Sequence, residues 1–121
     1  MGSHGAVASY ALGEDVWNAV KADWRTAPVS EGLRATLGFI EKQTLHPDEL
    51  THADAEAVYA AGVSKQALYD AMQVSAMFNM IVRLADSFGW DVPEWDALMA
   101  RAGAMLEGGY SLSASTARAK A

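Results

Sequence analysis

Three polar residues, Asn79, Arg83 and Asp86, lie three or four positions apart within a long apolar stretch of the sequence. Residues at this spacing share one face of a helix, so an amide, a guanidinium and a carboxylate would project from the same side. With Asn79 and Arg83 as the binding residues, this group can hold a small anion or carboxylate. It can also form a polar clamp within the helix or across a subunit interface. The clamp is the favoured interpretation, because buried polar groups need partners in any fold.

Two histidines, His46 and His52, raise the question of a metal site, with Asp48 between them. His46 precedes a proline in a predicted turn and His52 opens a predicted helix, so the two rings do not face one point as an i, i+4 pair does. We therefore expect no metal, and we assign both histidines to the surface or to helix capping. No cofactor is expected, since no glycine-rich phosphate loop follows a strand.

Nucleophilic catalysis has little support in the sequence. The chain has no cysteine, which excludes disulfides, cysteine-ligated zinc and a thiol nucleophile together. No serine lies in a Gly-x-Ser-x-Gly turn, and none has a histidine and an acid paired with it in sequence. The serines considered for this role are Ser9, Ser30, Ser64 and Ser111.

Length and charge limit the class of protein. The chain has 121 residues, 51% of them hydrophobic, which is enough for one domain with a core. Fifteen acidic residues against nine basic ones give a net charge of −6, so neither nucleic acid nor a membrane surface is an expected partner. No apolar run approaches the ~20 residues of a membrane span, and no signal peptide is recognisable. These features favour a cytoplasmic protein.

Hydrophobic periodicity and capping signals predict an all-α fold of about five helices, with no competing strand pattern. A single domain is expected over residues 1–109, followed by a disordered tail over 110–121. Pro93 is expected in the first turn of the last helix. The predicted helices cover 14–24, 31–44, a short segment after Thr51 that Gly62 ends, 65–88, and 93–107.

The longest predicted helix, Lys65–Phe88, is apolar around most of its circumference. Such a helix must be covered nearly all round, and its companions are short, so we expect a homo-oligomer that forms through this helix. The alternative is that its methionine-rich side lines a pocket for a small molecule. The side expected to face the core carries Ala67, Ala71, Val74, Met77, Phe78, Ile81, Leu84, Ala85 and Phe88. The other side carries Leu68, Met72, Ala76 and Met80.

Several short stretches, taken in order, resemble one family of helical enzymes. Phe78-Asn79 is followed by Arg83-Leu84-Ala85 inside the long helix. From about His4 to Val92 the chain resembles the C-terminal part of the alkylhydroperoxidase D-like / carboxymuconolactone decarboxylase superfamily, and within it the peroxidase-related branch. The resemblance implies that superfamily's helical bundle. The other stretches that carry it are Ser3-His4-Gly5-Ala6-Val7, Ala27-Pro28-Val29-Ser30 followed by Leu33 to Thr44, and Leu50-Thr51 through Ala61-Gly62-Val63-Ser64.

Redox members of this superfamily use an upstream Glu and a Cys-x-x-Cys-x-x-x-His motif, in which the dithiol attacks peroxide and Glu and His relay protons. Only His4 matches the motif, as its final His, and the second cysteine would fall one position before Met1. The resemblance therefore implies a peroxide-reducing, antioxidant fold whose reactive centre is cut off or lost. Two interpretations of His4 stay open: the family's proton-relay His, or a residue of a tag or frayed terminus.

Two other functions stay open beside the inactive peroxidase-like protein. One is a non-catalytic homo-oligomeric assembly module that pairs through the long helix. The other is a small-molecule binder that uses the Asn79 and Arg83 side of that helix.

The missing thiols give a direct test. Incubated with hydrogen peroxide and dithiothreitol, the chain should consume peroxide no faster than buffer does, because it has no cysteine to form a thiolate or a disulfide. The measurement is residual peroxide over time, with a protein-free sample as the control. Consumption above that control would contradict the prediction.

Overall fold

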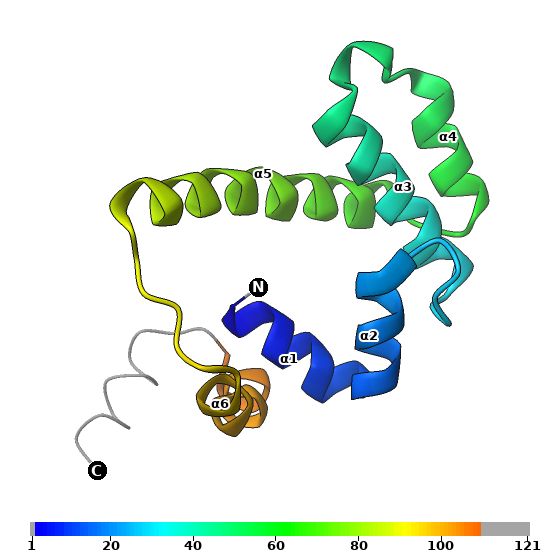
Figure 1. The fold of residues 1–121 in the computed structure, drawn as a ribbon. Coiled ribbons are helices and arrows are strands. Elements are labelled where there is room, and N and C mark those ends of the chain that lie inside the picture. The colour runs from blue at the N-terminus through cyan, green and yellow to red at the C-terminus, as the bar shows by residue number, and fades with distance from the viewer. Residues whose placement is uncertain (1, 110–121) are drawn as a thin grey trace. The chain divides into compact units, whose positions relative to one another are not determined.

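A computed structural model describes residues 2–109, and the regular structure in this range is entirely helical (Figure 1). Six α-helices and one 3-10 helix lie within it, and the described range contains no strand, which confirms the all-α prediction. The predicted tail over 110–121 lies outside the described residues. The elements are α1 (Ser3–Leu12), α2 (Glu14–Asp23), α3 (Glu31–Leu45), η1 (Pro47–Glu49), α4 (His52–Ala60), α5 (Lys65–Phe88) and α6 (Trp95–Gly108).

The chain divides into two compact units, so the single domain expected over 1–109 has two parts. The first unit comes from both ends of the sequence, with described residues 2–22 and 91–109. Here α1 packs along α6, and Ala6, Leu98 and Ala102 form the buried core. The N-terminal and C-terminal segments therefore stabilise each other.

Helix α1 is not predicted by the sequence patterns. Its ten residues are mostly small or apolar and show no stripe with a helical period. Its buried residues are Gly5, Ala6 and Ser9, whose small side chains let α1 approach its neighbours closely. Tertiary packing rather than periodicity therefore stabilises α1, which explains why a search for periodicity misses it.

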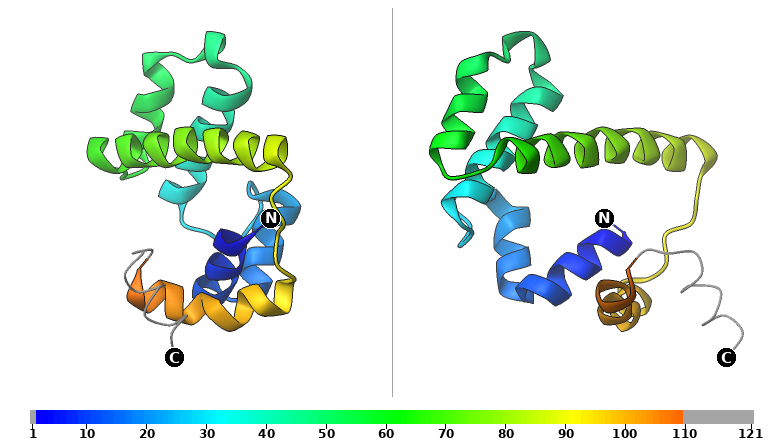
Figure 2. Two further views of the ribbon diagram at one scale, coloured as in Figure 1. Left: turned by 90° about the vertical axis from the view of Figure 1, so that its left-hand side faces the viewer. Right: turned by 180° about the vertical axis from the view of Figure 1, so that it is seen from behind.

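The second unit, residues 23–90, consists of the α3–α4 hairpin and α5 (Figure 2). Phe39 of α3, Val58 of α4 and Leu68 of α5 form its buried cluster. The C-terminal half of α5 extends beyond α3 and α4 in Figure 1 and in the right view of Figure 2. The one fully buried residue of α5 within the described range, Leu68, lies in its N-terminal half.

Serine side chains and left-handed glycines cap helices of the second unit. The side chains of Ser30 and Ser64 accept hydrogen bonds from backbone N–H groups in the first turns of α3 and α5, at 3.2 and 3.1 Å. Gly62 and Gly89 end α4 and α5 with φ angles of +87° and +61°, a region that glycine adopts without steric cost. These local signals explain why α5 begins and ends where the sequence predicts.

The predicted start of the last helix is wrong by two residues. Helix α6 begins at Trp95, and Glu94 is its N-cap with a ψ of 150°. Pro93 therefore lies before the helix and not in its first turn. Because the backbone of Glu94 is extended, the helix begins only at Trp95, two residues after the proline.

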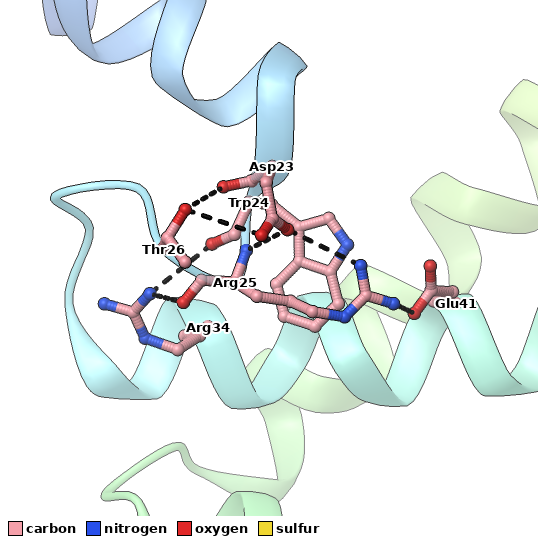
Figure 3. A network of polar contacts seen from close by, with 6 residues as sticks. All are labelled: Asp23, Trp24, Arg25, Thr26, Arg34 and Glu41. Carbon is pink, nitrogen blue, oxygen red and sulfur yellow. Dashed lines mark hydrogen bonds and ion pairs between the residues drawn. The ribbon is translucent and has the colours of Figure 1, made fainter.

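The segment between α2 and α3 is held by arginine side chains (Figure 3). Arg34 donates hydrogen bonds to the backbone carbonyls of Arg25 and Val29. The Arg25 guanidinium lies 4.5 Å from the centroid of the Trp24 ring and donates to Glu41. The hydrogen bonds from Arg34 give partners to backbone carbonyls of the connecting segment, which would otherwise have to bond to water.

The prediction of which side of α5 faces the core is wrong. Leu68 is buried, and Met72, Ser75 and Asn79 are partly buried, so the side expected to lie away from the core is the one that faces α3. Both sides are apolar, and the burial of Leu68 in the α3–α4 cluster fixes which one turns inward. The large residues predicted as core but exposed in the structure are Val74, Met77, Phe78, Ile81, Leu84 and Phe88.

Asp54 joins the start of α4 to α3. Its carboxylate accepts hydrogen bonds from the Thr51 backbone N–H at 2.7 Å, the Thr51 hydroxyl at 2.8 Å and the Lys42 ammonium at 2.7 Å. The Lys42 hydrogen bond, followed by those from Thr51, lowers the pKa of Asp54 to about 2. A carboxyl with a depressed pKa stabilises the fold above its unfolded pKa of about 3.9, and this stabilisation is lost as the pH falls toward 2.

Asp54→Asn should therefore lower the free energy of unfolding at neutral pH, and its difference from wild type should shrink as the pH falls from about 4 to about 2. Urea unfolding followed by circular dichroism at several pH values measures this. Asp48→Asn, at an acid of η1, is the matched control and should show no such trend. Equal stabilities of Asp54→Asn and wild type at pH 7 would contradict the prediction.

Gly5 provides a test of packing in the first unit. A Cβ on Gly5 would lie 2.9 Å from Cζ2 of Trp17. Gly5→Ala gains up to ~1 kcal/mol of helix propensity but overpacks the contact at a cost of ~1–3 kcal/mol, so we expect net destabilisation. With Trp17→Leu in the background the same change should stabilise, since the ring is gone. Urea unfolding of the four variants measures the coupling, and stabilisation by Gly5→Ala alone would refute the contact.

Candidate functional site

The polar residues singled out in the sequence form a ladder along α5. The Asn79 amide donates to the Ser75 carbonyl at 3.0 Å and contacts the Ser75 hydroxyl at 3.4 Å. One turn further on, Nη1 of Arg83 donates to the Asn79 carbonyl at 2.6 Å and to its side-chain oxygen at 3.2 Å. The clamp within the helix is thus present. Asp86 is exposed and has no hydrogen bond in this ladder among the described residues.

Arg83 carries a positive charge that no acid neutralises within the described range. None of the ion pairs in residues 2–109 includes its guanidinium. Its hydrogen bonds to Asn79 use Nη1 alone, and within residues 2–109 neither Nε nor Nη2 has a hydrogen-bond partner. An arginine held on one side and uncommitted on the other is suited to binding an anion.

A cavity of about 250 Å³ lies beside this ladder, between α5 and the last turns of α3. Sequence reasoning finds the α5 side of this cavity but not the α3 side, because nothing in sequence links the two helices. The side-chain oxygen of Gln43 is buried and has no hydrogen-bond partner among the described residues. The lining residues are Gln43 and Thr44 of α3 and Met72, Ser75, Ala76, Asn79 and Arg83 of α5.

The histidines do not join this site. His46 Nδ1 lies 3.9 Å from a carboxylate oxygen of Glu49, and His52 Nε2 lies 3.1 Å from Glu56, so each has an acid of its own helical turn nearby. His4 lies exposed on α1, in the unit formed by the chain ends, whereas Asn79 and Arg83 belong to the other unit.

A second cavity, of about 280 Å³, lies in the first unit around Trp17. The Trp17 indole nitrogen is buried without a hydrogen-bond partner among the described residues, and the Lys21 ammonium lies 5.5 Å from the ring centroid. Glu14 and Trp95 also line the cavity. The lysine over the ring adds a cation–π contact to its wall.

The third feature is the exposed apolar side of α5. Its residues follow a 3-4-3-4 spacing, the a and d positions of a coiled-coil heptad. Exposure is 42% for Ile81 at the centre and 71% for Phe88 at the end. We name this row the α5 seam: Val74, Met77, Ile81, Leu84 and Phe88.

The α5 seam lies on the side of the helix away from Leu68 and from the polar ladder, at 100° of rotation per residue. Asp70 occupies the d position before Val74 and accepts a hydrogen bond from Gln66 at 2.8 Å, so the apolar row ends there. From Ala71 to Val82 the helix has no charged residue. None of the described helices combines the length and apolarity needed to cross a bilayer.

Comparison with known proteins adds no family: no protein-family model matches the chain, and no curated protein matches its sequence. The resemblance to the alkylhydroperoxidase D-like superfamily therefore stays a prediction.

Proposed function

We propose that this chain is a homo-oligomeric assembly module in which the α5 seam packs against α5 of a second copy. The supporting observation is a heptad row of large apolar side chains exposed on a helix whose other side already packs on α3. Single exposed apolar residues need no explanation, but a continuous row of them marks an interaction surface. A peroxide-reducing role is not part of the proposal, because the chain has no cysteine.

The exposed area is sufficient for a weak dimer. The seam and its neighbours Phe78 and Met80 expose between 37% and 71% of each residue. We take about 150 Å² as the full area of each large apolar side chain, which is the lower value for aromatic residues. The exposed fractions of these seven residues then give roughly 550 Å² of exposed apolar area on each copy. Two copies would bury roughly 1,100 Å², just above the ~1,000 Å² expected of a specific interface. A dissociation constant in the micromolar range is consistent with this area.

Charge favours a second copy over a charged partner. The seam offers no charge by which a basic or acidic protein could recognise it, and an uncharged apolar row is complementary to itself. Both copies carry a net charge of −6 and repel each other at long range. Added salt screens this repulsion, so the dimer should tighten as ionic strength rises.

The residue types favour two strands. Val74 and Ile81 occupy a positions, Met77 and Leu84 occupy d positions, and β-branched residues at a with Leu at d favour a two-stranded coil. Phe88 ends the row beside Trp90, with their ring centroids 6.3 Å apart. The paired segment would be about two heptads long, which again indicates a weak and reversible dimer.

Ile81→Asp tests the assembly. This change places a carboxylate from each copy at the centre of the α5 seam and removes two buried side chains, each worth about 1.5–3 kcal/mol, so dimer affinity should fall at least ~100-fold. Sedimentation equilibrium over a micromolar concentration series measures the dissociation constant. Val82→Asp makes the same kind of change one residue on, at a b position outside the seam, and should leave the dimer intact.

Two results would overturn the proposal. One is a wild-type chain that stays monomeric throughout the concentration series. The other is an equal loss of affinity in Ile81→Asp and Val82→Asp, since the seam would then have no special part in association. Circular dichroism of each variant checks that the helices are retained.

A further inference from the structure

We infer that the cavity between α3 and α5 binds a small hydroxy-carboxylate anion, with Arg83 as the carboxylate receptor. This site is independent of the proposed dimer, since its residues and the α5 seam lie on opposite sides of the helix. The inference rests on three properties of the cavity: its charge, the fixed position of its cation, and the unpaired acceptor in its wall.

The charge of the cavity is positive. Arg83 is the one charged residue in its lining. Within residues 2–109 no carboxylate pairs with this arginine, although the chain has an excess of acids. A carboxylate would supply the missing counter-ion.

The position of the cation is fixed by the ladder. Asn79 holds Nη1 of Arg83 through two contacts, and Ser75 in turn holds the Asn79 amide. The Nε and Nη2 groups have no hydrogen-bond acceptor among the described residues. Their N–H bonds lie side by side along one edge of the planar guanidinium. This edge is the one that binds both oxygens of a carboxylate. Because the arginine is already positioned, binding loses little side-chain entropy.

The unpaired acceptor is the side-chain oxygen of Gln43, which is buried and has no hydrogen-bond partner within residues 2–109. Because this oxygen accepts no hydrogen bond within the described residues, the amide can turn toward the cavity without its oxygen losing one. A ligand hydroxyl near the carboxylate would supply the donor that it lacks. Met72 and Ala76 provide apolar contacts for the carbon atoms between these two groups.

The volume limits the size of the ligand. About 250 Å³ is below the range of ~300–1,000 Å³ of sites for drug-sized molecules. The pocket is open to solvent, so only the part of a ligand next to Arg83 needs to fit within this volume. A 2-hydroxy acid of three to four carbon atoms, with lactate as the simplest probe, matches the charge, the donor and the size.

The test is a titration of the isotopically labelled chain with sodium lactate, at an ionic strength kept constant with sodium chloride. Amide and arginine Nε resonances in ¹H–¹⁵N spectra should shift in a saturable way at Arg83 Nε and at the side-chain amides of Asn79 and Gln43. Arg83→Gln should weaken binding about tenfold or more, because it removes a charge-assisted pair. Arg101→Gln, at an exposed arginine of α6 outside this cavity, is the matched control and should bind as wild type does.

Two comparison ligands define the chemistry. Lactamide keeps the shape of lactate without its charge and should not bind. Acetate keeps the charge without the hydroxyl and should bind several-fold more weakly than lactate. Shifts that do not saturate, shifts that sodium chloride alone reproduces, or equal affinities of Arg83→Gln and wild type would overturn the inference. Acetate binding as tightly as lactate would overturn the assignment of Gln43.

Folding and assembly are controlled separately. The spectrum of Arg83→Gln reports directly whether that variant is folded, and Asn79→Ala gives a second variant that keeps the charge but loses the clamp, for which we expect a smaller loss of affinity. Sedimentation of Arg83→Gln should show the same dimer as wild type, because Arg83 is not in the seam. A failure of lactate binding and a failure of dimerisation are therefore distinguishable.

Discussion

The arrangement of residues 23–90 depends on one buried contact, the packing of Leu68 with Phe39 and Val58. Leu68 lies in the second turn of α5, where the helix leaves the α3–α4 hairpin. Its burial fixes the rotation of α5 about its own axis, and this rotation decides which side chains of the following five turns face α3. Burying one leucine is worth only about 1.5–3 kcal/mol, yet it chooses between two sides of similar hydrophobicity.

The two candidate sites both follow from that choice. With Leu68 turned inward, Ser75, Asn79 and Arg83 come beside the last turns of α3, and a polar cavity forms there. The heptad row is then turned away from α3 and lies exposed along a helix that extends beyond its neighbours. A single helix thereby separates a polar side from an apolar side, so that ligand binding and self-association use different residues.

Much of this fold is predictable from local signals. The limits of α5 follow from the Ser64 cap and the left-handed Gly89, which depend only on neighbouring residues. The clamp of Asn79 and Arg83 follows from helical spacing alone. Helix α1 is not predictable in this way, since its small residues gain their stability from α6, far away in the sequence.

The wrong prediction for the core side of α5 has the same physical origin. Periodicity identifies apolar sides but does not rank them when a helix has two, and here the decision depends on Phe39 and Val58, which belong to other helices. The contribution of Gln43 to the cavity was equally hidden, because it requires knowing that the end of α3 lies next to α5.

The discontinuous first unit has a consequence for biosynthesis. Residues 23–90 are contiguous, so their helices can fold as soon as they leave the ribosome. Helix α1 is made before residues 23–90 but must wait for α6, which follows them, before Ala6 is covered by Leu98 and Ala102. Closing this contact requires the whole intervening segment and is slow in comparison with local helix pairing. Until α6 is made, the nascent chain exposes the inner side of α1, so this helix is accessible to chaperones that bind apolar segments.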